Sequence, residues 1–495
     1  MNRRSFVAGA LSTSVLACVR GAVRTSRPSV THGVQIGDVQ NTSAIVWARC
    51  DEPARMVVDW DTTTSFASAR RVVGPIVTPE TDHTARVPLT GLPAGQTIVV
   101  RVRFEREAAR GASGWAMARF TTPGTGPFRF AWTGDTCGQG FGRNPEWGGL
   151  LGYKAIRAAE PAFWLHSGDL IYADNPILAE QKLADGRIWR NITNERIARP
   201  AQELDDFRAR FRYNYEDEHV RALAAEVPIL AQWDDHETHN NWWPGQQLED
   251  DRYTRERDAT VLSSYARRAT FEWTPIGGDS IHRVIHYGPL LDVIVVDLRS
   301  YRTPNDDNRG PARAMLGADQ AAWLADQLAA SRARWKIVAC DQPLSLVVPD
   351  GPDGKRNEAY ANGDPGRPLG REIELAGVLA AIEARGVRNV AWLTADVHYA
   401  AAHYYDPSRA IDAKLLPFWE FVAGPIHAGT FGPAELDPTF GPEVKFQWAP
   451  ERQNMAPWDG KQTFGTIDVS ADALAVGLWG IDGVRRYDVE IPYVG

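Results

Sequence analysis

The stretch "FWLHSGDLIYADNP", residues 163–176, is the part of the sequence that decides the fold. An apolar run stops at Gly168-Asp169, and Tyr172 follows three positions later. Such a run, bounded by glycine, is typical of a buried β-strand. In open α/β sheets, functional sites gather beyond the carboxyl ends of the strands. The stretch therefore predicts a strand that carries a carboxylate and a phenol at the rim of a sheet.

Four further segments end in the same way. Each is a short apolar run that stops at aspartate, with other polar side chains directly behind it. The segments are "FRFAWTGD" (128–135) with Asp135 and then Cys137, "VPILAQWDD" (227–235) with Asp235 and then His236, Asn240 and Asn241, "KIVACD" (336–341) with Asp341, and "AWLTAD" (391–396) with Asp396 and then His398. If these strands lie side by side, the polar groups meet at one edge of the sheet.

Segments with helical spacing alternate with these strands after Pro127, among them 149–160, 204–226, 317–333 and 374–386. Alternating strands and helices indicate an α/β domain. Residues 30–123 differ, because they contain short runs rich in β-branched residues separated by turn-like segments. They predict a small all-β sandwich of the fibronectin type III kind. The stretch 348–370, rich in Gly, Pro and Asp, predicts either a functional lid or a disordered loop.

The proposed boundaries follow from these changes of pattern. We expect a leader at 1–29, the β-sandwich at 30–123, a catalytic α/β domain at 127–462, and a β-rich segment at 463–495 that packs on it. The leader is suggested by Arg3 and Arg4 ahead of Phe6 and an apolar stretch, the pattern of a twin-arginine export signal. Cys18 follows Val15-Leu16-Ala17, which also allows a lipid anchor.

Composition limits the class of protein. The chain has 495 residues, 44% hydrophobic and 23% charged, which is ordinary for a globular protein. A formal charge of −8 argues against a nucleic-acid binder. Without Cys18 three cysteines remain, so no disulfide framework is implied. We expect an exported monomer, periplasmic or extracellular, that uses the twin-arginine machinery.

Several carboxylates in one crevice repel one another unless a cation holds them. A cluster of Asp, His, Tyr and Cys at strand ends therefore predicts a metal site. Tyrosinate, thiolate and imidazole suit a transition metal such as iron, whereas carboxylates and amides suit calcium or magnesium. The mixture suggests two unlike metals. Taken alone, Cys137 would also fit a buried apolar position, and Tyr172 or His398 an ordinary packing position.

At this point the sequence resembles the calcineurin-like metallophosphoesterases, and within them the PhoD-like alkaline phosphatase/phosphodiesterase family. The superfamily motifs correspond here to "GDTC", "GDLIY", "WDDHETHNNW", "CDQP" and "ADVH". The segments "ANGDPGRPLGRE" and "FWEFVAGPIHAGTFGP" resemble PhoD specifically, as does the β-rich start of the chain. The "GDLIY" variant is similar to that of the purple acid phosphatases, in which tyrosinate binds ferric iron. The resemblance implies a metallophosphoesterase-type sandwich of two β-sheets flanked by helices, with Fe3+ and Ca2+ as cofactors.

The resemblance also implies roles for individual residues. Asp169 would bridge two metals, and His236 would assist the leaving group. Asn240 and Asn241 would lie close to the phosphate or to the second metal. The implied metal ligands are Asp135, Cys137, Asp169, Tyr172, Asp235, Asp341, Asp396 and His398. Cysteine and two aspartates stand where the broad superfamily has histidines, which favours an oxygen-binding ion at the second site.

The expected activity is hydrolysis of phosphate monoesters or diesters by a metal-activated hydroxide. Arg143, in the Gly-rich stretch 138–149, either contacts a non-bridging oxygen or is an ordinary loop arginine. Two alternatives stay open. One is a phospholipase D-like or polymer-directed phosphodiesterase. The other is a non-enzymatic, calcium-stabilised exported binding protein.

Overall fold

The computed structural model describes residues 27–107 and 111–495. The proposed export signal and Cys18 lie outside the described residues. Among the described helices, none combines the length and apolar character that a membrane span requires. Cys50, Cys137 and Cys340 are buried and free within this part of the chain.

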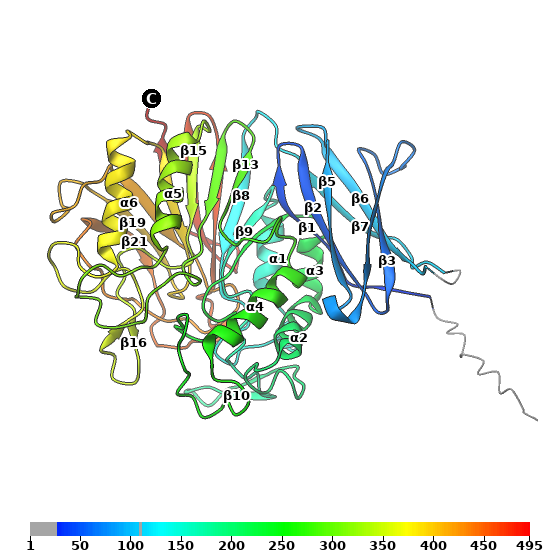
Figure 1. Ribbon diagram of the computed structural model, residues 1–495, viewed down its shortest axis with the longest axis horizontal. Coiled ribbons are helices and arrows are strands. Elements are labelled where there is room, and N and C mark those ends of the chain that lie inside the picture. The colour runs from blue at the N-terminus through cyan, green and yellow to red at the C-terminus, as the bar shows by residue number, and fades with distance from the viewer. Residues whose placement is uncertain (1–26, 108–110) are drawn as a thin grey trace, which may run out of the picture.

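Two large β-sheets face each other, and helices cover their outer sides (Figure 1). The first sheet has nine strands in the order β24-β23-β22-β8-β9-β12-β1-β2-β5. Its strands are β1 (Val30–Gln40), β2 (Ser43–Cys50), β5 (Thr84–Thr90), β8 (Phe128–Thr133), β9 (Trp164–Ser167), β12 (Ile229–Gln232), β22 (Thr463–Val469), β23 (Ala473–Gly480) and β24 (Arg485–Pro492). Strands β8, β9 and β12 are parallel, so their carboxyl ends lie at the same edge.

The second sheet has seven strands in the order β13-β14-β15-β18-β20-β19-β21. They are β13 (Arg283–Tyr287), β14 (Leu291–Val295), β15 (Trp335–Ala339), β18 (Val390–Thr394), β19 (Ala400–Tyr405), β20 (Phe418–Val422) and β21 (Pro442–Trp448). Strands β14, β15, β18 and β20 are parallel. Two hairpins, β10 (Glu180–Lys182) with β11 (Ile188–Arg190) and β16 (Pro349–Asp350) with β17 (Arg356–Asn357), stand outside the large sheets.

The expected β-sandwich is present at the N-terminal end, but it is not separate from the rest. Its outer sheet, β4-β3-β6-β7, consists of β3 (Ala54–Asp61), β4 (Arg70–Val77), β6 (Thr97–Glu105) and β7 (Ala116–Thr121). Its other layer, β1-β2-β5, continues the nine-stranded sheet, because β1 pairs in parallel with β12 at Gly37 and Ile229. The C-terminal strands likewise extend this sheet through the pairing of β22 with β8.

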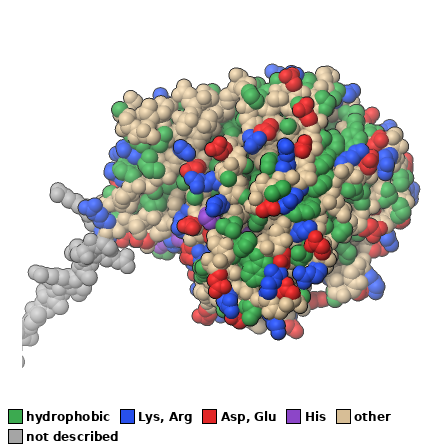
Figure 2. Space-filling model, turned by 180° about the vertical axis from the view of Figure 1, so that it is seen from behind, with side chains coloured by type: hydrophobic (Ala, Val, Ile, Leu, Met, Phe, Trp, Pro, Cys, Tyr) green, Lys and Arg blue, Asp and Glu red, His purple; other side chains and the backbone are tan. Residues whose placement is uncertain are grey.

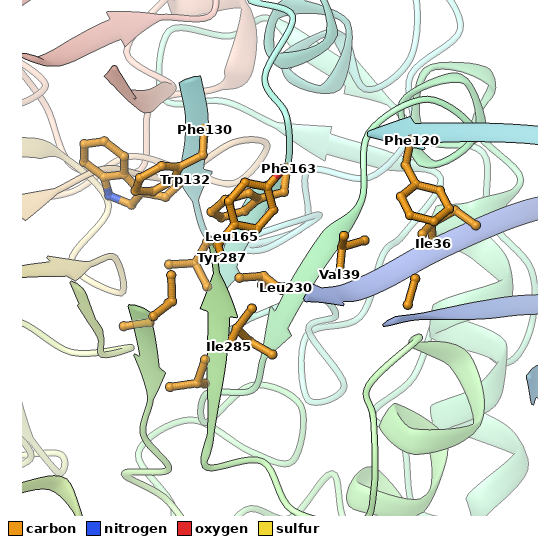
Figure 3. Packing of buried hydrophobic residues seen from close by; sticks show 14 of the residues in the cluster. Ile36, Val39, Phe120, Phe130, Trp132, Phe163, Leu165, Leu230, Ile285 and Tyr287 are labelled. Carbon is orange, nitrogen blue, oxygen red and sulfur yellow. The ribbon is translucent and has the colours of Figure 1, made fainter. Parts of the chain in front are cut away.

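One apolar core runs between the two large sheets and on into the N-terminal sandwich (Figure 3). Phe130, Leu165 and Leu230 come from the first sheet and pack with Ile285 and Tyr287 of the second. All five are at most 3% exposed. This shared core holds the two sheets in a fixed relation, so the loops at their common edge are held together as well.

Six α-helices complete the described fold: α1 (Leu151–Ala158), α2 (Leu204–Tyr215), α3 (Glu218–Ala224), α4 (Ala259–Trp273), α5 (Ala318–Ala330) and α6 (Glu372–Ala384), with 3₁₀ turns at Pro79–Thr81 and Pro457–Asp459. Helices α1 to α4 contribute to the cluster outside the first sheet, and α5 and α6 to that outside the second. The double sandwich flanked by helices, with a β-domain before it, is confirmed. On the face shown in Figure 2, basic and acidic side chains are intermixed.

Candidate active site

The predicted carboxylates meet where the strands of both sheets end. Asp135 and Asp169 follow β8 and β9, Asp235 follows β12, and Asp396 follows β18. Asp135, Asp169 and Asp235 are at most 2% exposed, and the side chain of Asp396 is 12% exposed. Three sets of ligand atoms lie within 4.8 Å of one another: Asp135, Asp169 and His398; Asp169, Asp235 and His236; and Asp234, Asp235 and Asp396. Asp169 and Asp235 each belong to two of the sets, as bridging residues would.

The backbone at these strand ends has an unusual conformation. Asp135, Cys137, Asp169, Asp396 and His398 all have a positive φ, between 54° and 69°. Residues with a side chain rarely adopt this left-handed region, and such strain concentrates at functional sites. The conformation turns the chain sharply at the exit of each strand.

The gathered carboxylates need a bound cation or a proton to offset their mutual repulsion. Burial, and then the neighbouring carboxylates, raise the pKa of Asp169 well above its usual value, and burial likewise raises that of Asp396. Both carboxylate oxygens of Asp135 are buried without a hydrogen-bond partner, as are Oδ1 of Asp235 and Oδ2 of Asp341. Unpartnered buried carboxylates are costly and uncommon. These residues therefore fit a site that holds metal ions.

The two ends of the cluster offer different ligands. At one end, burial lowers the pKa of His398 to about 4, so that its imidazole is neutral and able to bind a metal. The Tyr172 hydroxyl lies 2.7 Å from His398 Nε2, and burial raises the pKa of this phenol. At the other end, the ligand atoms of Asp234, Asp235 and Asp396 are all carboxylate oxygens. Such a difference suits two unlike ions.

His236 belongs to one of the three sets of ligand atoms and also lines the cleft over the carboxylates. Its Nδ1 lies 2.7 Å from Asp174 Oδ1, and its ring packs on that of Tyr172 with centroids 4.2 Å apart. Burial by itself would lower the pKa of His236, but the carboxylates of Asp174 and Asp235 raise it to about 9. Asp174 therefore fixes the orientation of the imidazole and favours its protonated form.

The cleft over the cluster has two lobes. The first, about 560 Å3, is lined by Asp169, Asp235, Asp396 and His398 together with apolar residues such as Val347. The second, about 940 Å3, is lined by Trp243, Arg252 and Arg356 among others. A set of residues lines both lobes: Gln139, His236, Asn240, Asn241, Pro349 and Phe431. A substrate bound at the cluster therefore has room on both sides of His236.

Asn240 and Asn241 are held by the carboxylates of the site. The backbone N–H of Asn240 donates to Asp174 Oδ2 at 3.2 Å, and that of Asn241 donates to Asp235 Oδ2 at 2.6 Å. The Asn241 side chain also donates to Asp350 at 3.1 Å. These contacts leave the Asn240 side chain at the mouth of both lobes.

Three predicted residues lie differently from the expectation. Arg143 lines neither lobe, because its guanidinium stacks on Tyr213 and donates to Glu216 at 2.7 Å. Of the two expectations for Arg143, this position fits the ordinary loop arginine rather than the contact with a non-bridging oxygen. The Cys137 thiol is not among the described groups of gathered ligand atoms and packs in an apolar cluster. Asp341 is also outside those groups, with Oδ2 3.5 Å from Arg299.

Sequence reasoning missed four residues of the site. Asp174 lies inside the opening stretch, five positions after Asp169, and its place before Asn-Pro hid it as a turn residue. Asp234 is adjacent to Asp235, and the sequence pattern does not show that both side chains belong to the site. Glu237 accepts from the backbone N–H groups of Asp169 and Asp234, at 3.2 and 2.7 Å. Arg299 gave no signal, because nothing in the sequence "DLRSYR" indicates that it is buried.

Family comparison agrees with this geometry. A model described as PhoD-like phosphatase matches residues 130–477, and one described as PhoD-like phosphatase, N-terminal domain, matches residues 16–123. The chain belongs to the PhoD-like phosphatase family. As a member of that family it is an enzyme, a hydrolase of phosphoric ester bonds. The alternative of a non-enzymatic binding protein is therefore set aside.

Individual relatives support the assignment. The chain is 26% identical over 443 residues to alkaline phosphatase D of Bacillus subtilis (strain 168). The aligned region covers 84% of this chain and 72% of the relative. Its fold matches a solved structure of PhoD with a TM-score of 0.71 and 19% identity, over 96% of this chain and 92% of that one. It also matches the purple acid phosphatase PPD1 from yellow lupin (Lupinus luteus) seeds, with a TM-score of 0.62 and 13% identity, over 94% and 74%.

Proposed function

We propose that the chain is an exported, metal-dependent phosphoesterase that hydrolyses phosphate mono- and diesters and favours diesters. The observation that carries the proposal is the set of buried, unpartnered carboxylates gathered beside His236 at the floor of an open cleft. Asp135, Asp169, Tyr172 and His398 would hold one ion, and Asp169, Asp235 and Asp396, with Asp234, the other. Cys137 remains a candidate ligand of the first ion, since a single residue separates it from Asp135 and it shares the same strained backbone.

The ligand chemistry supports Fe3+ at the first position and Ca2+ at the second. Bound cations supply a hydroxide nucleophile near neutral pH and offset the charge that develops on the phosphoryl oxygens. The side chains of the protein orient the phosphate and protonate the leaving group. Asn240 and Asn241 orient the phosphate at the mouth of the lobes. His236, positioned by Asp174, donates its Nε2 proton to the leaving oxygen, which makes the alcohol a better leaving group.

The preference for diesters follows from the charges of the cleft. A monoester carries a second negative charge that arginine or lysine commonly neutralises. The described lining of the two lobes contains no lysine, and both of its arginines are paired: Arg252 with Asp250 at 2.6 Å and Arg356 with Asp350 at 3.3 Å. The two lobes give space for a substituent on each side of the phosphate. This also keeps open a phospholipid or a phosphate-containing polymer as the natural diester.

Export is supported by Arg3 and Arg4 ahead of the apolar stretch, and a lipid anchor at Cys18 would hold the mature protein at a membrane. We propose the twin-arginine pathway, a periplasmic or extracellular location, and a monomer. Replacing both arginines by lysine should retain the protein in the cytoplasm, which cell fractionation measures. Export at the normal level would contradict this part of the proposal.

The enzymatic proposal is tested with pairs of monoesters and diesters that share one leaving alcohol. We expect the higher kcat/KM for the diester, with turnover abolished by a chelator and restored by Fe3+ and Ca2+ together. A higher kcat/KM for every monoester would contradict the proposed preference. Full turnover of metal-free protein would contradict the proposed metal dependence.

A further inference from the structure

Arg299 is buried at the all-carboxylate end of the site. Its side chain has no exposed surface, and its Nε donates to Asp234 Oδ1 at 2.6 Å. Nη2 lies 3.8 Å from Asp235 and 3.7 Å from Asp396. The guanidinium therefore contacts all three residues of that carboxylate group. The opposite group, Asp135, Asp169 and His398, has no arginine or lysine within ion-pair distance among the described residues.

Contacts on the side of Arg299 away from the carboxylate group hold its position. Its backbone N–H donates to Asp297 Oδ1 at 3.0 Å, and that same oxygen accepts from Trp233 Nε1 at 2.9 Å. Its Nη1 donates to Glu358, which is buried within the Gly/Pro-rich stretch 348–370. The residue thus links that stretch to the carboxylates of the site.

We infer that Arg299 is a built-in cation of the second metal site, which limits the divalent charge that this carboxylate group takes up. A fixed positive charge among carboxylates offsets part of their repulsion, and it also repels an incoming ion. The arginine therefore lowers the affinity of this carboxylate group for divalent ions. This inference rests on the proposed metal-dependent function. Arg299 is a positioning and charge-setting residue, because it lines neither lobe and does not reach the substrate.

Arg302 provides a matched control. It is equally buried and also binds Glu358, with Nη1 2.7 Å from the carboxylate. It has no ion pair with any of the carboxylates that gather at the site. Replacing Arg302 therefore removes the same charge from the same buried network without touching the second metal site.

The experiment measures Ca2+ binding to the full chain by equilibrium dialysis and elemental analysis, for the wild type, R299Q, R299K and R302Q. Glutamine removes the charge and keeps a hydrogen-bond donor, whereas lysine keeps the charge. We expect R299Q to bind Ca2+ roughly tenfold more tightly, or to take up one more ion. R299K and R302Q should remain within about threefold of the wild type. Equal affinity and stoichiometry in all four proteins, or weaker Ca2+ binding in R299Q, would overturn the inference.

Loss of folding does not block the test. If R299Q folds only when Ca2+ is present, while R302Q folds without it, Ca2+ is replacing the charge of the arginine and the inference is supported. If R299Q fails to fold even in Ca2+ while R302Q folds, the charge is not what Arg299 supplies, and the inference is wrong. A wild type that binds no divalent ion at all would instead remove the proposed function.

Discussion

Replacing Asp174 by asparagine tests whether His236 acts as the proton donor. The carboxylate of Asp174 is 2% exposed and lies 2.7 Å from His236, which is 7% exposed, so the variant removes a short, charge-assisted hydrogen bond. Such a bond contributes about 2 kcal/mol, which corresponds to roughly 30-fold in kcat/KM. The loss should depend on the leaving group. An alkoxide needs the proton and should show the full effect, whereas a nitrophenolate leaves without it and should show little.

The assay compares an alkyl and a 4-nitrophenyl diester with the same second substituent. Asp292→Asn is the matched control, because Asp292 is also buried and lies 2.8 Å from His286, in a pair that lines neither lobe of the cleft. It should leave both rates within about twofold of the wild type. The same loss on both substrates in D174N would refute the reasoning, because a general acid must matter more for the poorer leaving group.

The remaining predictions concern stability. Gly168 has φ of +92°, and an added Cβ would overlap Asp234, so G168A should lower the free energy of unfolding by about 3 kcal/mol in thermal unfolding. The control is Gly245→Ala, which has φ of +84° but open space around the added Cβ, and it should lower stability clearly less. Equal losses in the two variants would contradict the close contact at Gly168. Burial lowers the pKa of His166 from 6.5 to about 3. The folded state therefore binds fewer protons than the unfolded state between these values, and stability falls as the pH drops from 6.5 towards 3, by about 2 kcal/mol at pH 5. Denaturant unfolding at pH 5 and 7.5 should show this difference shrinking in H166Q, and an unchanged difference would show that another group titrates.

The fold was predictable because its signals are local. Most of the parallel strands, among them β8, β9, β12, β15 and β18, are short apolar runs followed by aspartate, and such runs can be recognised one at a time. The helical stretch 204–226 was predicted as one helix, but it is two, because Asp217 caps α3 by accepting from the backbone N–H groups of His219 and Val220. The joining of the N-terminal sandwich to the main sheet depends on one pairing between Gly37 and Ile229, which are distant in sequence. No local pattern reveals such a contact.

The residues at the strand ends of the site could be predicted from the sequence, whereas their partners could not. Asp135, Asp169, Asp235 and Asp396 could be found because the ends of parallel strands meet at one edge. The direction of a side chain after the strand could not be found. Arg143 lies in the loop after β8, as the sequence indicates, yet its side chain turns towards Glu216. Arg299 lies at the centre of the carboxylates although its segment has no glycine or histidine to mark it. Charge partners of this kind are set by tertiary packing rather than by sequence spacing.

The central claim is that carboxylates from separate strands hold cations at a shared rim. Asp169 and Asp235 each belong to two of the three ligand groups, and Asp169 is the residue that joins the group of His398 to the others, so the claim depends strongly on it. The decisive measurement is the metal content per chain of purified Asp169→Asn and of wild type by elemental analysis, each verified as folded by circular dichroism. The account predicts at least two metal ions in the wild type, and in the variant a loss of metal together with turnover. An unchanged metal content in D169N, with turnover intact, would contradict it.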